Sequence, residues 1–313
     1  MDDIISKRKK KIVSWVGLLL IVVSLVFIVQ RFLEVELDYA VFTSPRVVAG
    51  LAAVVVAKSL VVLFTATNYG YWLFNVTGMI IPLPEIFKVY CSANLYKYIP
   101  GGFLTILGRN KLAVDYEELG HGRVATATVL EGAFFVIAAI IIAMLYSFDY
   151  AINELKQIDT LPMASAIVAG IVAVIALVTY LMRHRIKRFL ERIGVVGVLN
   201  PLVLTKRMGV ALVLTNLWGA AFVFILVLLD QPMTTSTALT VIGLFNLSWL
   251  VGFFVPIAPA GFGIREAAVL MFIGSIVNDD FLFLAIMSHR VVSILGDVGA
   301  YCIAVIYANI KRV

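Results

Sequence analysis

Residues 259–266 read Pro-Ala-Gly-Phe-Gly-Ile-Arg-Glu and interrupt a long apolar stretch of the sequence. Residues 100–103 read Pro-Gly-Gly-Phe, and they interrupt another such stretch 159 residues earlier. Proline ends a helix because it lacks the backbone N–H and clashes with the preceding turn, and glycine tolerates backbone angles that other residues avoid. Each segment therefore predicts a helix that is broken partway along its length.

The composition of the chain is that of a membrane protein. Of its 313 residues, 62% are hydrophobic and 14% are charged, whereas soluble domains have about 25% charged residues. A helix needs about 20 apolar residues to cross a bilayer, and such runs lie at 12–30, 47–66, 123–148, 163–182, 208–229 and 282–306. The sequence therefore predicts an all-α polytopic membrane protein with six full transmembrane helices and two broken re-entrant hairpins, at 84–112 and 236–278. Two full spans within 236–278 are the alternative, because residues 238–254 are almost entirely apolar.

Lysine and arginine collect at the N-terminus (7–11), in the loop at 183–207 and at 311–312, whereas the loops at 31–46 and 147–162 are acidic. Basic loops stay in the cytoplasm, so we expect both termini inside and a multi-pass protein of the cell inner membrane. The net charge of +6 then reflects topology and contact with anionic lipids, and it needs no nucleic-acid partner.

The two breaks lie in equivalent surroundings. A long apolar run begins 53 residues before the first proline and 51 before the second, and another begins 23 and 22 residues after them. The loop charges give the 47–66 and 208–229 runs opposite directions. The sequence thus predicts a single membrane domain with two inverted units, about 47–148 and 208–306, and two peripheral helices, 12–30 and 163–182. Inverted repeats with broken helices are typical of transporters, in which the broken-helix tips meet near mid-membrane.

Six charged residues lie within the apolar stretches or beside the breaks: Arg109, Glu131, Arg265, Glu266, Arg290 and Asp297. Each costs about 2.5–3.5 kcal/mol at the centre of a lipid-facing helix, so we expect them to face one another or water. Glu131 and Arg290 both lie 31 residues after the proline of their unit, which favours an ion pair between the units. The alternative to a polar path is a buried structural network.

Arginine next to a half-helix N-terminus is suited to binding phosphate, because its planar fork and the free backbone N–H groups both donate hydrogen bonds. We expect Arg109 and Arg265 to hold a phosphate. The residues at which the backbone would approach the substrate are Pro100, Gly101, Gly102, Pro259, Gly261 and Gly263. The three histidines share no metal-binding spacing and no nucleotide-binding loop is present, so we expect no catalytic residue, no metal and no cofactor.

Two polar or aromatic segments have less specific interpretations. Tyr69, Tyr71, Trp72 and Phe74 follow the 47–66 run and fit an interfacial aromatic belt. Residues 94–98 (Asn-Leu-Tyr-Lys-Tyr) lie just before the first break. There they either contact a lipid headgroup or interact with water in a hydrated hairpin.

The segments Tyr98-Ile99-Pro100-Gly101-Gly102 with Arg109, then Glu131, then 259–267 resemble the hallmark segments of the lysylphosphatidylglycerol synthase transmembrane region, also called the flippase-like integral membrane family. The likeness covers about residues 12–307, and Ala260 departs from it where the family often has glycine. Two-domain members carry a soluble aminoacyl transferase domain after the membrane part, whereas this chain stops at Val313. The resemblance therefore implies lipid translocation rather than aminoacyl transfer.

We expect a non-enzymatic, flippase-like transporter of a lipid with a polar or phosphate-containing headgroup, such as an aminoacyl phospholipid or a polyprenyl-phosphate-linked sugar. Its partners are then membrane lipids, with envelope biosynthesis enzymes and a homo-oligomer left open. Two alternatives stand beside this one: a membrane glycosyl- or phosphotransferase acting on a lipid-linked sugar, and a non-catalytic subunit of an envelope biosynthesis complex.

Overall fold

The structure is a computed structural model, and it describes residues 42–98, 104–156, 200–254 and 259–310. Within these ranges the chain forms helices and no strand. Several predicted features lie outside the described residues: the helices 12–30 and 163–182, most of the basic loop 183–207, and the first break at Pro100, Gly101 and Gly102.

The α-helices are α2 (Pro45–Thr77), α3 (Leu83–Leu95), α4 (Leu104–Arg109), α5 (Lys111–Asp115), α6 (His121–Lys156), α8 (Pro201–Leu228), α9 (Thr235–Phe253), α10 (Ile264–Ile273) and α11 (Asp279–Ile310). Short 3-10 turns add η2 (Tyr96–Tyr98), η3 (Glu117–Leu119) and η5 (Pro259–Gly261). Among the described residues, α2, α6, α8, α9 and α11 contain segments long and apolar enough to cross a membrane. Four of these contain or overlap the predicted runs 47–66, 123–148, 208–229 and 282–306. The fifth, α9, has 19 residues, whereas α10 has 10.

Local capping explains where several helices begin and end. Asn200 Oδ1 accepts from the Leu202 N–H at 2.9 Å before α8, and Thr234 Oγ1 accepts from the Thr237 N–H at 3.2 Å before α9; these are the usual N-cap bonds. Helix α2 ends at Thr77, and Gly78 after it takes a left-handed conformation with φ 75°, as is common at helix C-termini.

Helix α2 continues to Thr77, well past the predicted end of the run at residue 66. Its last turns therefore carry the aromatic residues that the sequence placed in an interfacial belt. Tyr69 and Trp72 are instead 0% and 1% exposed and lie in the core, so this interpretation was wrong for them. Tyr71 and Phe74 are exposed. The reason is that the helical period turns only one side of α2 inward.

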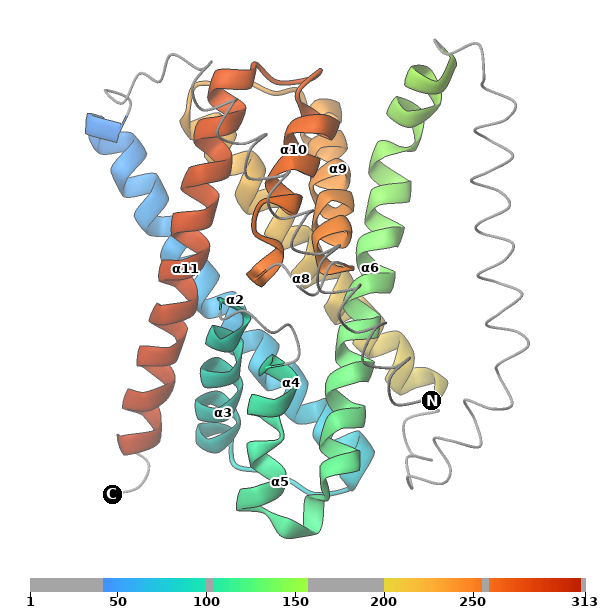
Figure 1. Cartoon of the computed structure of the whole chain (residues 1–313), viewed down its shortest axis with the longest axis vertical. Helices are drawn as coiled ribbons and strands as arrows, with labels where there is room; N and C mark the ends of the chain where they lie inside the picture. Colours follow the sequence, from blue (N-terminus) through green and yellow to red (C-terminus); the bar gives the residue numbers. More distant parts are fainter. Residues whose placement is uncertain (1–41, 99–103, 157–199, 255–258, 311–313) are drawn as a thin grey trace, which may run out of the picture.

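The broken regions lie in different parts of the molecule. In Figure 1 the helices α3, α4 and α5 occupy the lower part of the picture and α9 and α10 the upper part, while α2 and α11 extend through both. The turns η2 and η5 contact each other. The ends of α3 and the start of α10 are thus brought together near the middle of the bundle.

The helices that follow the two breaks also pack across the two parts of the molecule, the first of which comprises α2 to α6 and the second α8 to α11. Helix α11 packs against α2 and α3, and helix α6 packs against α8 and α9. Helix α10 packs against α9, its neighbour in sequence. Each part still has an apolar core of its own, because one buried cluster is formed by residues of α2, α3, α5 and α6 and another mainly by residues of α8 to α11.

Exposure is distributed as in a membrane protein. Arg109, Glu131, Glu266 and Asp297 are 7%, 2%, 3% and 1% exposed, while large apolar side chains cover the outer surface of the long helices, with Leu145 72% exposed. Apolar patches this extensive are rare on soluble monomers. Together with the five long apolar helices, this distribution makes the chain a multi-pass membrane protein.

Candidate functional site

The charges beside the first break form an ion pair, in which Arg109 Nε and Glu131 Oε1 are buried without a hydrogen-bond partner. Arg109 is the last residue of α4, and its Nη1 lies 2.5 Å from Glu131 Oε2 on α6. Both side chains are buried, and the guanidinium carbon lies 4.1 Å from the ring centroid of Tyr90 and 4.8 Å from that of Tyr69. The charge of Arg109 is therefore balanced by one carboxylate and two aromatic faces.

The predicted ion pair between Glu131 and Arg290 is not formed. Glu131 pairs with Arg109, and Arg290 donates from Nε to Glu266. The pairing follows local contacts: α6 contacts α4, which carries Arg109, and α11 contacts α10, which carries Glu266. Arg109 also lies at the end of a six-residue helix and not at its N-terminus, which removes the geometry expected for a phosphate there.

The second break is a tight turn with unusual backbone angles. Ala260, Gly261 and Gly263 have φ values of 51°, 70° and 84°, a region that favours glycine. A Cβ added to Gly261 would lie 3.2 Å from Gly252 Cα near the end of α9. Glycine is thus required at 261, whereas Ala260 accepts a strained conformation.

Glu266 and Arg290 hold this turn against α11. The Gly263 N–H donates to Glu266 Oε2 at 2.7 Å, Arg290 Nε donates to Glu266 Oε1, and Arg290 Nη1 donates to the Ala260 carbonyl at 3.3 Å. Charge-assisted bonds of this kind are roughly twice as strong as neutral ones. The pair therefore fixes where the N-terminus of α10 points.

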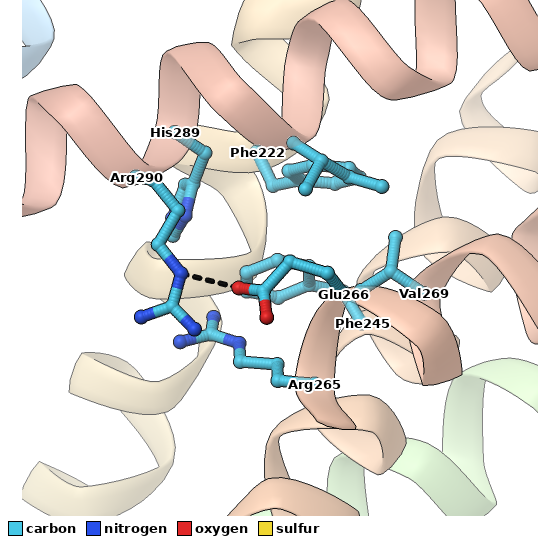
Figure 2. A pocket seen from close by; sticks show the side chains of 8 residues that line it. Phe222, Phe245, Arg265, Glu266, Val269, His289 and Arg290 are labelled. Carbon is cyan, nitrogen blue, oxygen red and sulfur yellow. Dashed lines mark hydrogen bonds and ion pairs between the residues drawn. The ribbon is translucent and has the colours of Figure 1, made fainter. Parts of the chain in front are cut away.

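Arg265, the second residue of α10, has no such partner. Its guanidinium carbon lies 4.7 Å from the Phe245 ring centroid, and within the described ranges it forms no hydrogen bond and no ion pair with a carboxylate. Figure 2 shows its guanidinium beside that of Arg290, at a small cavity of about 10 Å³. Arg290 Nη2 is buried there without a hydrogen-bond partner. Two guanidinium groups thus present free donors to one place.

Asp297 joins the two parts of the molecule. Its side chain on α11 is 0% exposed and is contacted by Lys97 Nζ at 2.6 Å from Oδ2, by the Tyr98 hydroxyl at 2.5 Å from Oδ2, and by Asn94 Nδ2 at 2.9 Å from Oδ1. These donors come from α3 and η2, just before the first break. All three donate to a carboxylate within the protein, whereas the sequence predicted contact with a lipid headgroup or with water in a hydrated hairpin.

The sequence analysis missed Lys58, which lies in the 47–66 run on α2. Its Nζ lies 5.0 Å from the ring centroid of Trp218 on α8, and it borders a cavity of about 80 Å³ between α2, α8 and α11. The signal was present, because a charged residue inside an apolar run is the same signal that identified Glu131 and Asp297. It was overlooked because the run was treated as uninterrupted.

Together these residues carry a surplus of positive charge. The charged side chains gathered around the breaks are Lys58, Lys97, Arg109, Arg265 and Arg290 on one side and Glu131, Glu266 and Asp297 on the other. Five cations thus face three carboxylates, and Lys58 and Arg265 are the two without a carboxylate partner in the described part of the chain. The same part contains no cluster of three or more His, Cys, Asp or Glu residues able to hold a metal ion. The arrangement is suited to binding an anion.

No protein-family model matches this chain, and no curated protein sequence matches it.

Proposed function

We propose that this protein is a flippase-like transporter of lipids that carry a phosphate in the headgroup. The observation that carries the proposal is Arg265, a cation without a carboxylate partner beside the free Nη2 of Arg290. It lies inside a multi-pass membrane protein, close to the contact between η2 and η5. A buried charge is strongly unfavourable unless it is paired, so a bound phosphate would supply the missing partner.

The inverted repeat is part of the proposal. The contacts support it, because α11 packs on α2 and α3 as α6 packs on α8 and α9. In this scheme α2, α3 and α6 are the counterparts of α8, α9 and α11. The two re-entrant regions, α3 to α5 and α9 to α10, would then enter from opposite sides of the membrane and open to each side in turn.

The polar residues have distinct roles in this scheme. Arg265 and Arg290 bind the phosphate, and Glu266 orients Arg290 through its Nε. The Arg109–Glu131 pair and Asp297 hold the helices together. The acyl or prenyl chains of the lipid stay in the bilayer, where the exposed apolar faces of the helices contact them. Aminoacyl phospholipids and polyprenyl-phosphate-linked sugars share the phosphate chemistry that these residues recognise.

The cellular location follows the charge distribution of the sequence. The basic segments at the N-terminus, 183–207 and 311–312 favour the cell inner membrane with both termini in the cytoplasm. Envelope biosynthesis enzymes that make or use the lipid would be its functional partners.

The test is leaflet exchange in proteoliposomes. Fluorescent phosphatidylglycerol is reconstituted with the purified protein, and a membrane-impermeant reductant bleaches the outer leaflet as lipid arrives there. Loss of a charge-assisted hydrogen bond costs about 1.5–3 kcal/mol, so Arg265→Ala is expected to slow exchange by about 10- to 100-fold. The exchange rate of Arg265→Lys should fall between those of the parent protein and Arg265→Ala, since lysine keeps the charge but loses the bidentate fork.

The matched control is Arg46→Ala, which removes an exposed arginine whose Nη1 lies 3.4 Å from Asp230 at the end of α8. Exchange by this variant should equal that of the parent protein. If Arg265→Ala also exchanges phosphatidylglycerol at the parental rate, the proposed phosphate site is wrong. If the parent protein exchanges no phosphate-containing lipid at all, transport itself is wrong.

A further inference from the structure

The second cation without a carboxylate partner lies in a cavity of its own. Lys58 borders the cavity of about 80 Å³ between α2, α8 and α11. Asp297 acts on it electrostatically, but that carboxylate already accepts bonds from Lys97, Tyr98 and Asn94. The Lys58 ammonium forms no hydrogen bond and no ion pair with any described residue, and the face of Trp218 is its neighbour.

Two other residues that line the cavity carry polar groups. Trp218 lines it, and the indole Nε1 is buried without an acceptor in the described structure. Ser293 on α11 lines it as well. The Lys58 ammonium is positive and can only donate hydrogen bonds, so the cavity is suited to an oxygen-rich anion.

The cavity reaches the lipid-facing surface of the protein. Ala57 on α2 and Leu217 on α8 line it, and both are exposed on the apolar exterior, Leu217 to 46%. An anion that enters here with its apolar tail still in the bilayer would lie between α2 and α8. This position favours an anionic phospholipid over free phosphate, which would have to arrive from water.

The cavity also adjoins the site at the second break. His289 lines both this cavity and the smaller one beside Arg265. A water molecule needs a cavity of about 10–15 Å³, so the Arg265 cavity of about 10 Å³ has room for one water at most, whereas the cavity at Lys58, of about 80 Å³, is several times larger. In this conformation the Lys58 cavity is therefore the roomier of the two.

We infer that Lys58, Trp218 and the walls around them form a lateral entry site that binds the phosphate of an anionic phospholipid before it reaches Arg265. The inference that phospholipid binds here stands on the cavity and on the Lys58 ammonium without a carboxylate partner, and only its role as an entry site rests on the proposed function. Gly296 helps to shape the site, because a Cβ added there would lie 2.5 Å from Lys58 Cγ. Gly296→Ala is thus a second way to displace the ammonium without removing it.

The experiment uses Trp218 as the reporter. Phosphatidylglycerol brominated on the acyl chain near the headgroup is titrated into the purified protein, and the quenching of tryptophan fluorescence is recorded. The same titration of Trp218→Phe is subtracted, which isolates the Trp218 signal from the other tryptophans. Lys58→Met is expected to weaken the apparent affinity by about tenfold or more, Gly296→Ala to weaken it in the same direction, and Lys58→Arg to retain most of it.

Two controls separate a specific site from general attraction. Lys206→Met removes an exposed lysine from α8, about 18 Å along the helix from Trp218, and it should leave quenching unchanged. In the parent protein, brominated phosphatidylcholine should bind more weakly than brominated phosphatidylglycerol. In Lys58→Met, the two lipids should bind with equal affinity.

The outcome that overturns the inference is parental quenching by phosphatidylglycerol in both Lys58→Met and Gly296→Ala, with each variant still folded by size-exclusion chromatography. The measurement is made at equilibrium and needs no leaflet exchange. A parent protein that fails to exchange lipid but shows Lys58-dependent quenching would therefore overturn the proposed transport and leave the binding site standing.

Discussion

The two breaks carry similar charges but use them differently. Beside the first, Arg109 is bonded to Glu131 and enclosed by two tyrosine rings. Beside the second, Glu266 and Arg290 form the corresponding pair, and Arg265 is left over next to them. The pairs are also reversed in sign, since the arginine is on the broken helix in one case and on the following helix in the other.

This difference predicts which charges are structural and which are available for binding. A buried ion pair fixes helix positions, and removing one member leaves a charge without a partner. A cation that has no partner in the folded protein is free to bind something else, and its removal should leave the fold intact. Stability and binding measurements on matched variants therefore test the assignment of each break.

The largest effect is expected at the first break. Glu131→Leu leaves Arg109 buried without a carboxylate, and breaking a buried pair in this way costs about 3–5 kcal/mol. The free energy of unfolding in detergent micelles measures the loss. Replacing both partners, in Arg109→Met with Glu131→Leu, should recover most of it, because the uncompensated charge is then gone.

The comparison variant is Arg265→Met at the second break. Because Arg265 has no carboxylate partner and lies beside Arg290, its removal should leave the stability unchanged or raise it. A loss for Arg265→Met as large as that for Glu131→Leu would show that the two breaks do not differ in this way.

A smaller effect is expected where the two parts are joined. Asp297→Asn keeps the shape of the side chain but removes the charge that Lys97 contacts at 2.6 Å and that Tyr98 contacts at 2.5 Å. Hydrogen bonds to charged groups contribute about 1.5–3 kcal/mol, so unfolding in micelles should be easier by about that amount.

Asp230→Asn is the control for this substitution. Asp230 is exposed and lies 3.4 Å from Arg46, and exposed pairs contribute about 0–1 kcal/mol. Equal losses in the two variants would mean that Asp297 does not connect the parts.

The smallest effect is expected at Ala260, and its sign is opposite. A left-handed conformation costs a non-glycine residue about 1–2 kcal/mol, and the higher backbone entropy of unfolded glycine offsets part of the gain. Ala260→Gly, at φ 51°, should therefore raise the free energy of unfolding by about 0.5–1 kcal/mol. Ala267→Gly in the regular part of α10 should lower it by about 1 kcal/mol, and a loss in both variants would contradict the strain at the second break.

Much of the helical framework was predictable from the sequence. Long apolar runs gave the approximate positions of α2, α6, α8 and α11, because crossing a bilayer requires length and hydrophobicity that few other structures need. The second break was predictable because Pro259 and Gly261 have strong local preferences. The same reasoning placed Glu131 and Asp297 in the interior.

The partners of the charges were not predictable in the same way. Equal spacing from Pro100 and Pro259 suggested that Glu131 would pair with Arg290, but spacing along the chain says nothing about which helices pack together. The pairing follows from the contact of α6 with α4 and of α11 with α10. Lys58 was not predicted as a site residue because one lysine changes the mean hydropathy of a long apolar run very little.

The contact of Asp297 with Tyr98 and its neighbours has a consequence for biosynthesis. The two residues are 199 positions apart, and ribosomes add about 5–20 residues per second. About 10–40 s therefore pass between the synthesis of η2 and the synthesis of Asp297. During that interval the growing polypeptide has an amine, an amide and a phenol inside the membrane with nothing from α11 to receive them, so assistance from the insertion machinery would matter most then.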